Sequence, residues 1–126
     1  MRLLLARGLK PDDARSVVAS FEGKIYMSKG KPGDVFVITE ASPGTASGFY
    51  VTRDFAGDTA ADRARNLALP PTNTAEHEGI VELTRPQTLL EGRVAPQPDW
   101  GADRTGGGWQ VVTDGGSHTG AVGRIM

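Results

Sequence analysis

A run of three glycines followed by a tryptophan and a glutamine is the part of the chain best suited to chemistry. Gly106, Gly107 and Gly108 have no Cβ, so the turn accepts positive φ and lets backbone approach a ligand closely. Gln110 then lies at the start of an apolar strand, where its amide can form hydrogen bonds with a small, flat, polar ligand. A glycine-rich hairpin turn explains the same stretch on local grounds, so its meaning depends on the rest of the chain.

The composition indicates one domain with many short elements. At 126 residues the chain is long enough for a single core, and its 17 glycines and 8 prolines argue against a helical bundle. Cysteine is absent, which excludes disulfides and thiolate metal sites, and His77 and His118 lie too far apart to suggest zinc. The formal net charge of −1 disfavours binding to a nucleic-acid backbone, which usually requires a positive excess.

The pattern of apolar residues and turn signals predicts an α+β fold. N-terminal helices come first, followed by a twisted, mostly antiparallel sheet with one inserted helix. We expect a helical lead-in over 1–22 and a β-rich core over 23–126 of one domain. The opening Met1–Arg7 should begin a helix rather than a signal peptide, because charge returns at Arg7 and Lys10. Helices are predicted over 1–21, interrupted at Pro11, and over 59–69; strands over 24–28, 35–39, 48–52, 79–83, 89–95, 110–113 and 121–125.

Two local signals sharpen this prediction. Thr59 or Asp58 can cap the inserted helix, and Pro70-Pro71 ends it. Residues 96–108 form a long loop rich in proline and glycine. A loop of that length is uncommon in so short a chain unless it is functional or mobile.

Three segments together carry a resemblance to a known family. They are the strand Gly48–Thr52, the helix end Arg65–Pro71, and the strand Leu90–Gln97 leading to Gly106–Gln110. Over about residues 24–125 the chain resembles NAD-consuming toxin domains at the C-termini of large secreted bacterial proteins. One group is the tuberculosis-necrotizing-toxin-like NAD glycohydrolases. In overall sequence the chain more closely resembles the ADP-ribosyltransferase toxins of contact-dependent-inhibition and Rhs effectors, including the type that modifies elongation factor Tu.

The resemblance implies a split, two-lobed β fold with NAD as the substrate in its cleft and with no metal. Gln110 would act at the glycosidic bond, and Glu91 is the nearest carboxylate in sequence, on the preceding strand. Many ADP-ribosyltransferases have a glutamate where this chain has Gln110, so transfer to a protein and hydrolysis both stay open. Tyr50 or Phe49 would stack on nicotinamide. The remaining NAD-binding residues implied in this way are Tyr26, Ser28, Lys29, Thr52, Arg65, Gly107 and Gly108.

The resemblance also implies partners and a place of action. We expect a cognate immunity protein and an acceptor protein in the target cell, with no membrane partner. The domain would be secreted as the C-terminal part of a larger effector and would act in the target-cell cytoplasm. Nucleic acid would be a partner only in the alternative described next.

Other interpretations stay open beside an ADP-ribosyltransferase toxin. One is an NAD glycohydrolase on the same scaffold; another is a ribonuclease toxin that uses His118, Lys29 and Thr113; a third is a plain binding module. Simpler structural roles also exist for the candidate residues. Gln110 and Glu91 can face solvent, Arg65 can complement its helix dipole, Tyr26 and Tyr50 can fill the core, and Trp100 with Trp109 can clamp the long loop as a lid.

Overall fold

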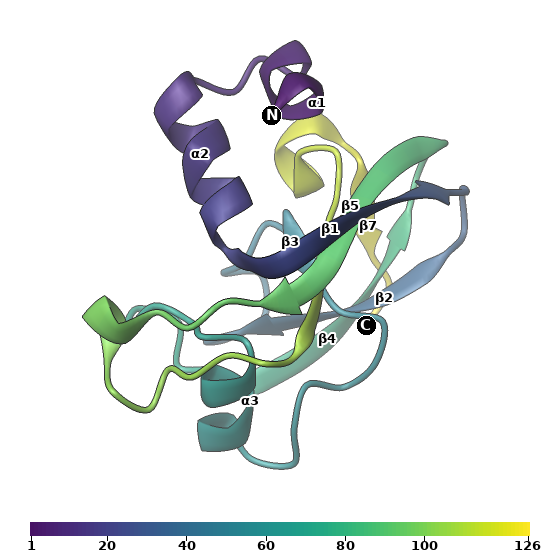
Figure 1. The fold of residues 1–126 in the computed structure, drawn as a ribbon. Helices are drawn as coiled ribbons and strands as arrows, with labels where there is room; N and C mark the ends of the chain where they lie inside the picture. The colour runs from purple at the N-terminus through teal and green to yellow at the C-terminus, as the bar shows by residue number, and fades with distance from the viewer.

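The chain folds into two antiparallel sheets with two helices over one of them (Figure 1). The computed structural model describes all 126 residues. One sheet has the strand order β1-β5-β6-β3 and the other β2-β4-β7, so the predicted α+β class is confirmed. The strands are β1 (Phe21–Gly30), β2 (Val35–Glu40), β3 (Tyr50–Val51), β4 (His77–Leu83), β5 (Gln87–Val94), β6 (Trp109–Val112) and β7 (Val122–Arg124). The α-helices are α1 (Arg2–Ala6), α2 (Pro11–Ala19) and α3 (Ala60–Asn66).

The helices begin where the sequence predicts them. Pro11 separates α1 from α2 and occupies the first position of α2, where its missing N–H costs no helical hydrogen bond. The Thr59 hydroxyl caps α3 by accepting a hydrogen bond from the Asp62 amide at 3.1 Å. The break at Pro11 and the Thr59 cap are confirmed, but the predicted end of the inserted helix at Pro70-Pro71 is wrong, because α3 ends at Asn66. None of these helices has the length and apolar character that crossing a bilayer requires.

Strand β1 differs from its prediction at the N-terminal end. It starts at Phe21 rather than 24, directly after α2, which ends at Ala19. Gly23, with a φ of 77°, lies in an irregularity where the β1–β5 register shifts between Glu22 and Tyr26. A left-handed glycine inside a strand supplies the extra twist that such a bulge needs. The helical lead-in is therefore joined to the sheet without a linker.

A single backbone bridge joins the two sheets. Val37 of β2 and Thr52, just after β3, exchange two hydrogen bonds of 2.8 and 2.9 Å. The predicted strand over 48–52 is reduced to Tyr50–Val51, because the chain turns from one sheet to the other at this point. The result is the split β arrangement that the resemblance implied.

Two clusters of apolar side chains fill the space on either side of the first sheet. One lies between the sheets and consists of Phe36, Ile38, Val51, Val81, Leu83, Leu89, Val111 and Val122. The other lies beneath the helices and consists of Leu4, Ala14, Val17, Phe21, Leu90 and Val112. Because neighbouring residues of a strand face opposite ways, Val111 and Val112 belong to different clusters. The first sheet is thus covered on both faces, by α1 and α2 on one and by the second sheet on the other (Figure 1).

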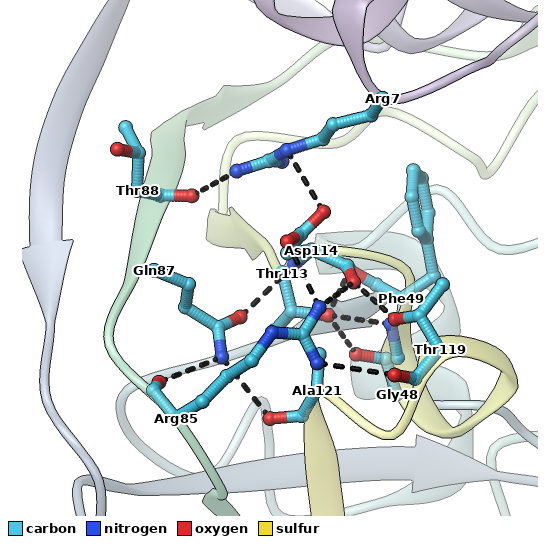
Figure 2. Close-up of polar contacts among 11 residues, drawn as sticks. Arg7, Gly48, Phe49, Arg85, Gln87, Thr88, Thr113, Asp114, Thr119 and Ala121 are labelled. Carbon is cyan, nitrogen blue, oxygen red and sulfur yellow. Dashed lines mark hydrogen bonds and ion pairs between the residues drawn. The ribbon is translucent and has the colours of Figure 1, made fainter.

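A carboxylate after β6 ties the N-terminal helices to this framework (Figure 2). Asp114 forms an ion pair with Arg7 at 3.0 Å and accepts a hydrogen bond from Arg85 at 2.9 Å, while Arg7 donates to the Thr88 carbonyl. Burial lowers the pKa of the Arg7 guanidinium, although Asp114 counteracts the shift. The neighbouring Thr113 hydroxyl donates to the Gly48 carbonyl at 2.7 Å. These contacts fix α1 and the segment before β3 relative to β6.

The glycine run packs against the end of α3 rather than forming a free hairpin turn. The Gly106 amide donates to the Arg65 carbonyl at 2.9 Å, and the Gly108 amide donates to the Asn66 carbonyl at 3.0 Å. A Cβ on Gly106 would lie 2.6 Å from the Val94 carbonyl oxygen, and one on Gly108 would lie 2.9 Å from the Asn66 oxygen. The glycines are needed because backbone meets backbone at this point.

We expect Gly106→Ala to destabilise the fold more than Gly107→Ala. Both positions have positive φ, which costs an L-residue roughly 1–2 kcal/mol, but only Gly106 also has carbonyl oxygens in the way of a Cβ. The Gly106 variant should therefore lose about 1–2 kcal/mol more in the free energy of unfolding, measured by urea denaturation. Equal losses for the two variants would contradict this account of the glycine run.

Candidate functional site

A cavity of about 490 Å³ opens where the two sheets separate. Its walls come from the end of α2, from β2, from the chain approaching β3, from the segment after α3 and from the long loop. That volume is in the usual range for small-molecule sites. Twenty-one residues line it, and none is Asp, Glu, Lys, Arg or His. The polar lining side chains are Ser16, Ser20, Thr39, Ser47, Tyr50, Thr52, Asn73, Gln97 and Gln110.

Gln110 lies in the wall of this cavity with its amide fixed from one side. Its side chain is 6% exposed, and its Nε2 donates to the Ser20 carbonyl at 3.0 Å and to the Ser20 hydroxyl at 3.2 Å. The Ser20 hydroxyl in turn donates to the Val17 carbonyl in α2. No group of the chain donates to Oε1 of Gln110. The amide therefore keeps one acceptor oxygen for a ligand, in an orientation that α2 determines.

Tyr50 and Thr52 line the same cavity. The Tyr50 hydroxyl is 3.5 Å from the Ser20 hydroxyl, and burial raises the pKa of the Tyr50 phenol, so this group stays protonated. Thr52 donates from its hydroxyl to the Asp54 carbonyl at 2.6 Å, which holds the chain as it leaves the bridge between the sheets. Phe49, the other aromatic residue implied by the resemblance, also lines the cavity and packs edge-on against Tyr50.

Two further features mark the cavity as more than a packing defect. Oγ1 of Thr39 is buried and has no hydrogen-bond partner, although such groups are nearly always paired in folded proteins. Ala68, in the wall formed after α3, has a φ of 47°. Left-handed backbone at a non-glycine residue is costly and concentrates at ligand sites. The unpaired Thr39 hydroxyl in the β2 wall is typical of a ligand site, while the left-handed Ala68 in the wall after α3 also ends that helix, where the Leu69 amide donates to the Ala64 carbonyl at 3.0 Å.

Glu91 lies outside the cavity, in a cage of hydrogen-bond donors. Its carboxylate accepts from Arg53 Nε at 2.9 Å, from Arg53 Nη2 at 2.7 Å, from Trp109 Nε1 at 2.9 Å and from the Ser28 hydroxyl. These four bonds use the acceptor positions of a carboxylate. They lower the pKa of Glu91 to about 2, the Arg53 bonds contributing most, in spite of its burial. Glu91 is thus charged at neutral pH, and both of its carboxylate oxygens are hydrogen-bonded.

Strand geometry puts Glu91 and Gln110 on opposite faces of the sheet. Gln110 pairs with Gly92 across β5 and β6, and Glu91 is the next residue along β5. Gln110 consequently faces α2, whereas Glu91 lies on the face that carries Val111 and the second sheet. The two residues expected to share the catalytic work are separated by the sheet itself.

A smaller hollow of about 260 Å³ adjoins the cavity and shares Thr52 and Leu67 with it. In contrast to the cavity, it has charged and aromatic walls, which include Arg53, Asp54, Phe55 and Trp109. Phe55 is 67% exposed, and Trp109 is also exposed, although its indole N–H is bound to Glu91. This second hollow is therefore the charged extension of an uncharged cavity.

The structure brings only some of the expected NAD-binding residues to these spaces. Gly108 lines the second hollow. Arg65 is paired with Asp62 at 2.7 Å on the surface of α3. Ser28 donates to Glu91, and the ring of Tyr26 packs against Trp109 with 5.8 Å between centroids. Neither space is lined by Tyr26, Ser28, Lys29, Arg65 or Gly107.

The residues of the ribonuclease interpretation are not assembled into a site. Thr113 is fully buried, and its hydroxyl donates to the Gly48 carbonyl and accepts from the Gly116 amide, so no phosphate can reach it (Figure 2). His118 lies in the exposed 3₁₀ turn Gly116–Thr119, and Lys29 lies on β1. Neither residue lines the cavity or the second hollow.

Sequence reasoning missed several residues of the site. Ser20, Thr39 and Asn73 are polar residues at the ends of a helix, a strand and a loop, where nothing local distinguishes them from ordinary caps. Gln97 and Trp100 could have been found, since both belong to the long loop that was expected to be functional or mobile. Arg53 follows directly on a segment of the resemblance, but its role depends on Glu91, which is distant in sequence.

Comparison with known proteins identifies a shared fold. No family model and no curated protein matches the chain. Among solved structures, it is similar to Tse6 in complex with Tsi6, with a TM-score of 0.69, 18% identity, and coverage of 99% of this chain and 90% of that one. It is also similar to Tne2 in complex with Tni2 (TM-score 0.62, 21% identity, coverage 84% and 92%). A third is Rhs1-CT in complex with its cognate immunity protein RhsI1 (TM-score 0.62, 17% identity, coverage 84% and 80%).

The Glu91 cage should make the stability of the protein depend on acid pH. Because the pKa of Glu91 in the folded chain is about 2, below its ordinary value of 4.5, its contribution is complete above about pH 4.5 and disappears toward pH 2. Glu91→Gln should therefore lower the free energy of unfolding by about 1–3 kcal/mol at neutral pH and by much less near pH 2.5. Urea titrations at both pH values measure this difference.

Glu22→Gln is the matched control, because Glu22 is an exposed glutamate on β1 and makes no side-chain hydrogen bond. It should change stability by less than about 0.5 kcal/mol at either pH. If Glu91→Gln is equally harmless at neutral pH, the carboxylate does not hold Arg53 and Trp109 as described.

Proposed function

We propose that this chain is an NAD-hydrolysing toxin domain that splits the bond between nicotinamide and ribose in the 490 Å³ cavity. The observation that carries the proposal is the chemistry of the cavity wall. It contains fixed amides and hydroxyls, aromatic rings and no ionised side chain. A reaction performed there must therefore proceed without a carboxylate or imidazole as general acid or base.

Cleavage of NAD is such a reaction. The nicotinamide ring of NAD carries a positive charge, and it takes the electron pair of the breaking C–N bond and departs as a neutral base. The leaving group needs no proton, in contrast to O-glycosides, whose hydrolysis uses a pair of carboxylic groups. Water adds to C1′ of the ribose and releases one proton to solvent. The products are nicotinamide and ADP-ribose.

Gln110 is the group placed to assist this step. Its free Oε1 is a fixed partial negative charge beside a ribose that develops positive charge at C1′ in the transition state. The same oxygen can accept a hydrogen bond from a ribose hydroxyl or from the attacking water. Because Ser20 already binds the amide N–H groups, the side chain needs no reorganisation when the charge develops.

Hydrolysis is favoured over transfer of ADP-ribose to a protein. A glutamate beside the glycosidic bond would stabilise the cation and also orient a protein nucleophile, and the chain offers none in the cavity. Glu91 faces the other side of the sheet, and four donors occupy its oxygens. We assign Glu91 the role of a positioning residue for Arg53 and Trp109.

The toxin role is supported by the resemblance and by the similar structures. The three similar structures described above are complexes, and Rhs1-CT is bound to a cognate immunity protein. We therefore propose a cognate immunity protein as the natural partner of this domain. As an effector domain, it would act in the cytoplasm of the target cell, where NAD is available to it.

The first test is consumption of NAD by the purified domain alone. The wild-type protein should release nicotinamide without any acceptor, and Gln110→Ala should reduce kcat about 10²–10³-fold, as removal of one fixed transition-state dipole does elsewhere. Liquid chromatography of NAD, nicotinamide and ADP-ribose measures both quantities. Glu22 is exposed on β1 and lines neither space, so Glu22→Ala should leave the rate of NAD hydrolysis unchanged.

Three outcomes separate the competing functions. Intact NAD, with and without bacterial lysate, would overturn the proposal. NAD loss that requires lysate and labels one protein would replace hydrolysis by ADP-ribosyl transfer. Intact NAD together with cleaved RNA would restore the ribonuclease alternative.

The second test is the pH profile of hydrolysis. Because the cavity wall contains no group that titrates near neutrality, kcat should vary less than about threefold between pH 5.5 and 8.5. A bell-shaped profile would indicate a general acid and base, and would contradict catalysis by fixed dipoles. Circular dichroism at each pH establishes that the fold is retained over this range.

A further inference from the structure

We infer that the second hollow binds the adenosine diphosphate half of the dinucleotide. This inference rests on the proposed function, because it assigns the other end of the substrate whose nicotinamide end meets Gln110. The hollow shares Thr52 and Leu67 with the cavity, so a ligand too long for the cavity continues directly into it. Nothing in the proposed reaction itself requires this second space.

Its walls have the chemistry that a purine nucleotide needs. Two aromatic side chains, Phe55 and Trp109, line a hollow whose mouth is open to solvent. A nucleobase presents a flat π-face that stacks on such rings without a specific hydrogen-bond pattern. Phe55 is 67% exposed, which is unusual for a phenylalanine with only a structural role.

Arg53 is the one cation that lines either space, and it retains a free donor. Two of its guanidinium nitrogens are bound to Glu91, while Nη1 has no partner in the chain. Its guanidinium also lies 5.3 Å from the centre of the Phe36 ring. A guanidinium held in this way presents a fixed N–H to a diphosphate oxygen in the second hollow, next in sequence to Thr52, which both spaces share.

Glu91 preorganises the side chains that line the second hollow. The same carboxylate accepts from Arg53 and from the Trp109 indole, and so it fixes the cation and one aromatic wall relative to each other. Side chains that are already ordered lose little conformational freedom when a ligand arrives. The caged carboxylate thus serves substrate binding from outside the reaction cavity.

The test compares NAD with nicotinamide mononucleotide, which lacks the adenosine half, in wild type and Phe55→Ala. Phe55→Ala should raise KM for NAD about tenfold, with kcat little changed and with nicotinamide mononucleotide kinetics unaltered. Met27→Ala is the matched control, because Met27 is 65% exposed and lines neither space. Met27→Ala should leave kcat and KM unchanged for both substrates.

Binding of ADP alone, measured by calorimetry, gives a readout independent of turnover. Wild type and Met27→Ala should bind ADP, and Phe55→Ala should bind it about tenfold more weakly. The double variant Arg53→Gln/Glu91→Gln, which removes both charges together, should also weaken ADP binding.

These outcomes separate this inference from the proposed function. If the protein hydrolyses NAD but does not bind ADP, or if Phe55→Ala has the wild-type KM for NAD, the assignment of the second hollow is wrong and the proposed reaction is unaffected. ADP binding that depends on Phe55 in a protein that never cleaves NAD would support the hollow and overturn the reaction.

Discussion

The two hydrogen bonds between Val37 and Thr52 are the constraint from which the rest of the molecule follows. They are the only ladder contact between the two sheets, so the sheets meet at one point and diverge beyond it. The space opened by this divergence cannot be filled by a two-residue strand such as β3. The end of α2, the segment after α3 and the long loop close it, and each contributes polar side chains to the resulting cavity.

The sequence segments that carry the family resemblance are held together by backbone. The amides of Gly106 and Gly108 bind the carbonyls of Arg65 and Asn66, and a Cβ on either glycine would meet a carbonyl oxygen. This explains why a glycine run accompanies a particular helix end in the same chain. The same contacts place the end of α3 against the glycine run, and of the three glycines only Gly108 lines the second hollow.

Local signals predicted most of the fold and little of the site. Helix starts at Pro11 and Thr59 and the apolar strands could be read from the sequence, because capping and alternation are local rules. The cage around Glu91 could not, since it joins Ser28, Arg53 and Trp109 from three segments across a register that shifts near Gly23. The ribonuclease alternative used Thr113, and the sequence alone did not show that the fold buries this residue against Gly48.

The separation of charge between the two spaces has a consequence for catalysis. A fixed dipole such as the Gln110 amide acts more strongly where no ionised group or bulk water screens it, so an uncharged cavity increases its effect on a developing cation. In the proposed function, such a wall would not hold the phosphates of a dinucleotide, and Arg53 in the adjoining hollow would bind them. Glu91 orients Arg53 by a bidentate ion pair, and the sheet separates Glu91 from the cavity. A carboxylate moved to the cavity side would add stabilisation of the cation, but it would also attract the guanidinium away from the phosphates. In the proposed function, this arrangement would favour water as the acceptor of the ADP-ribosyl group.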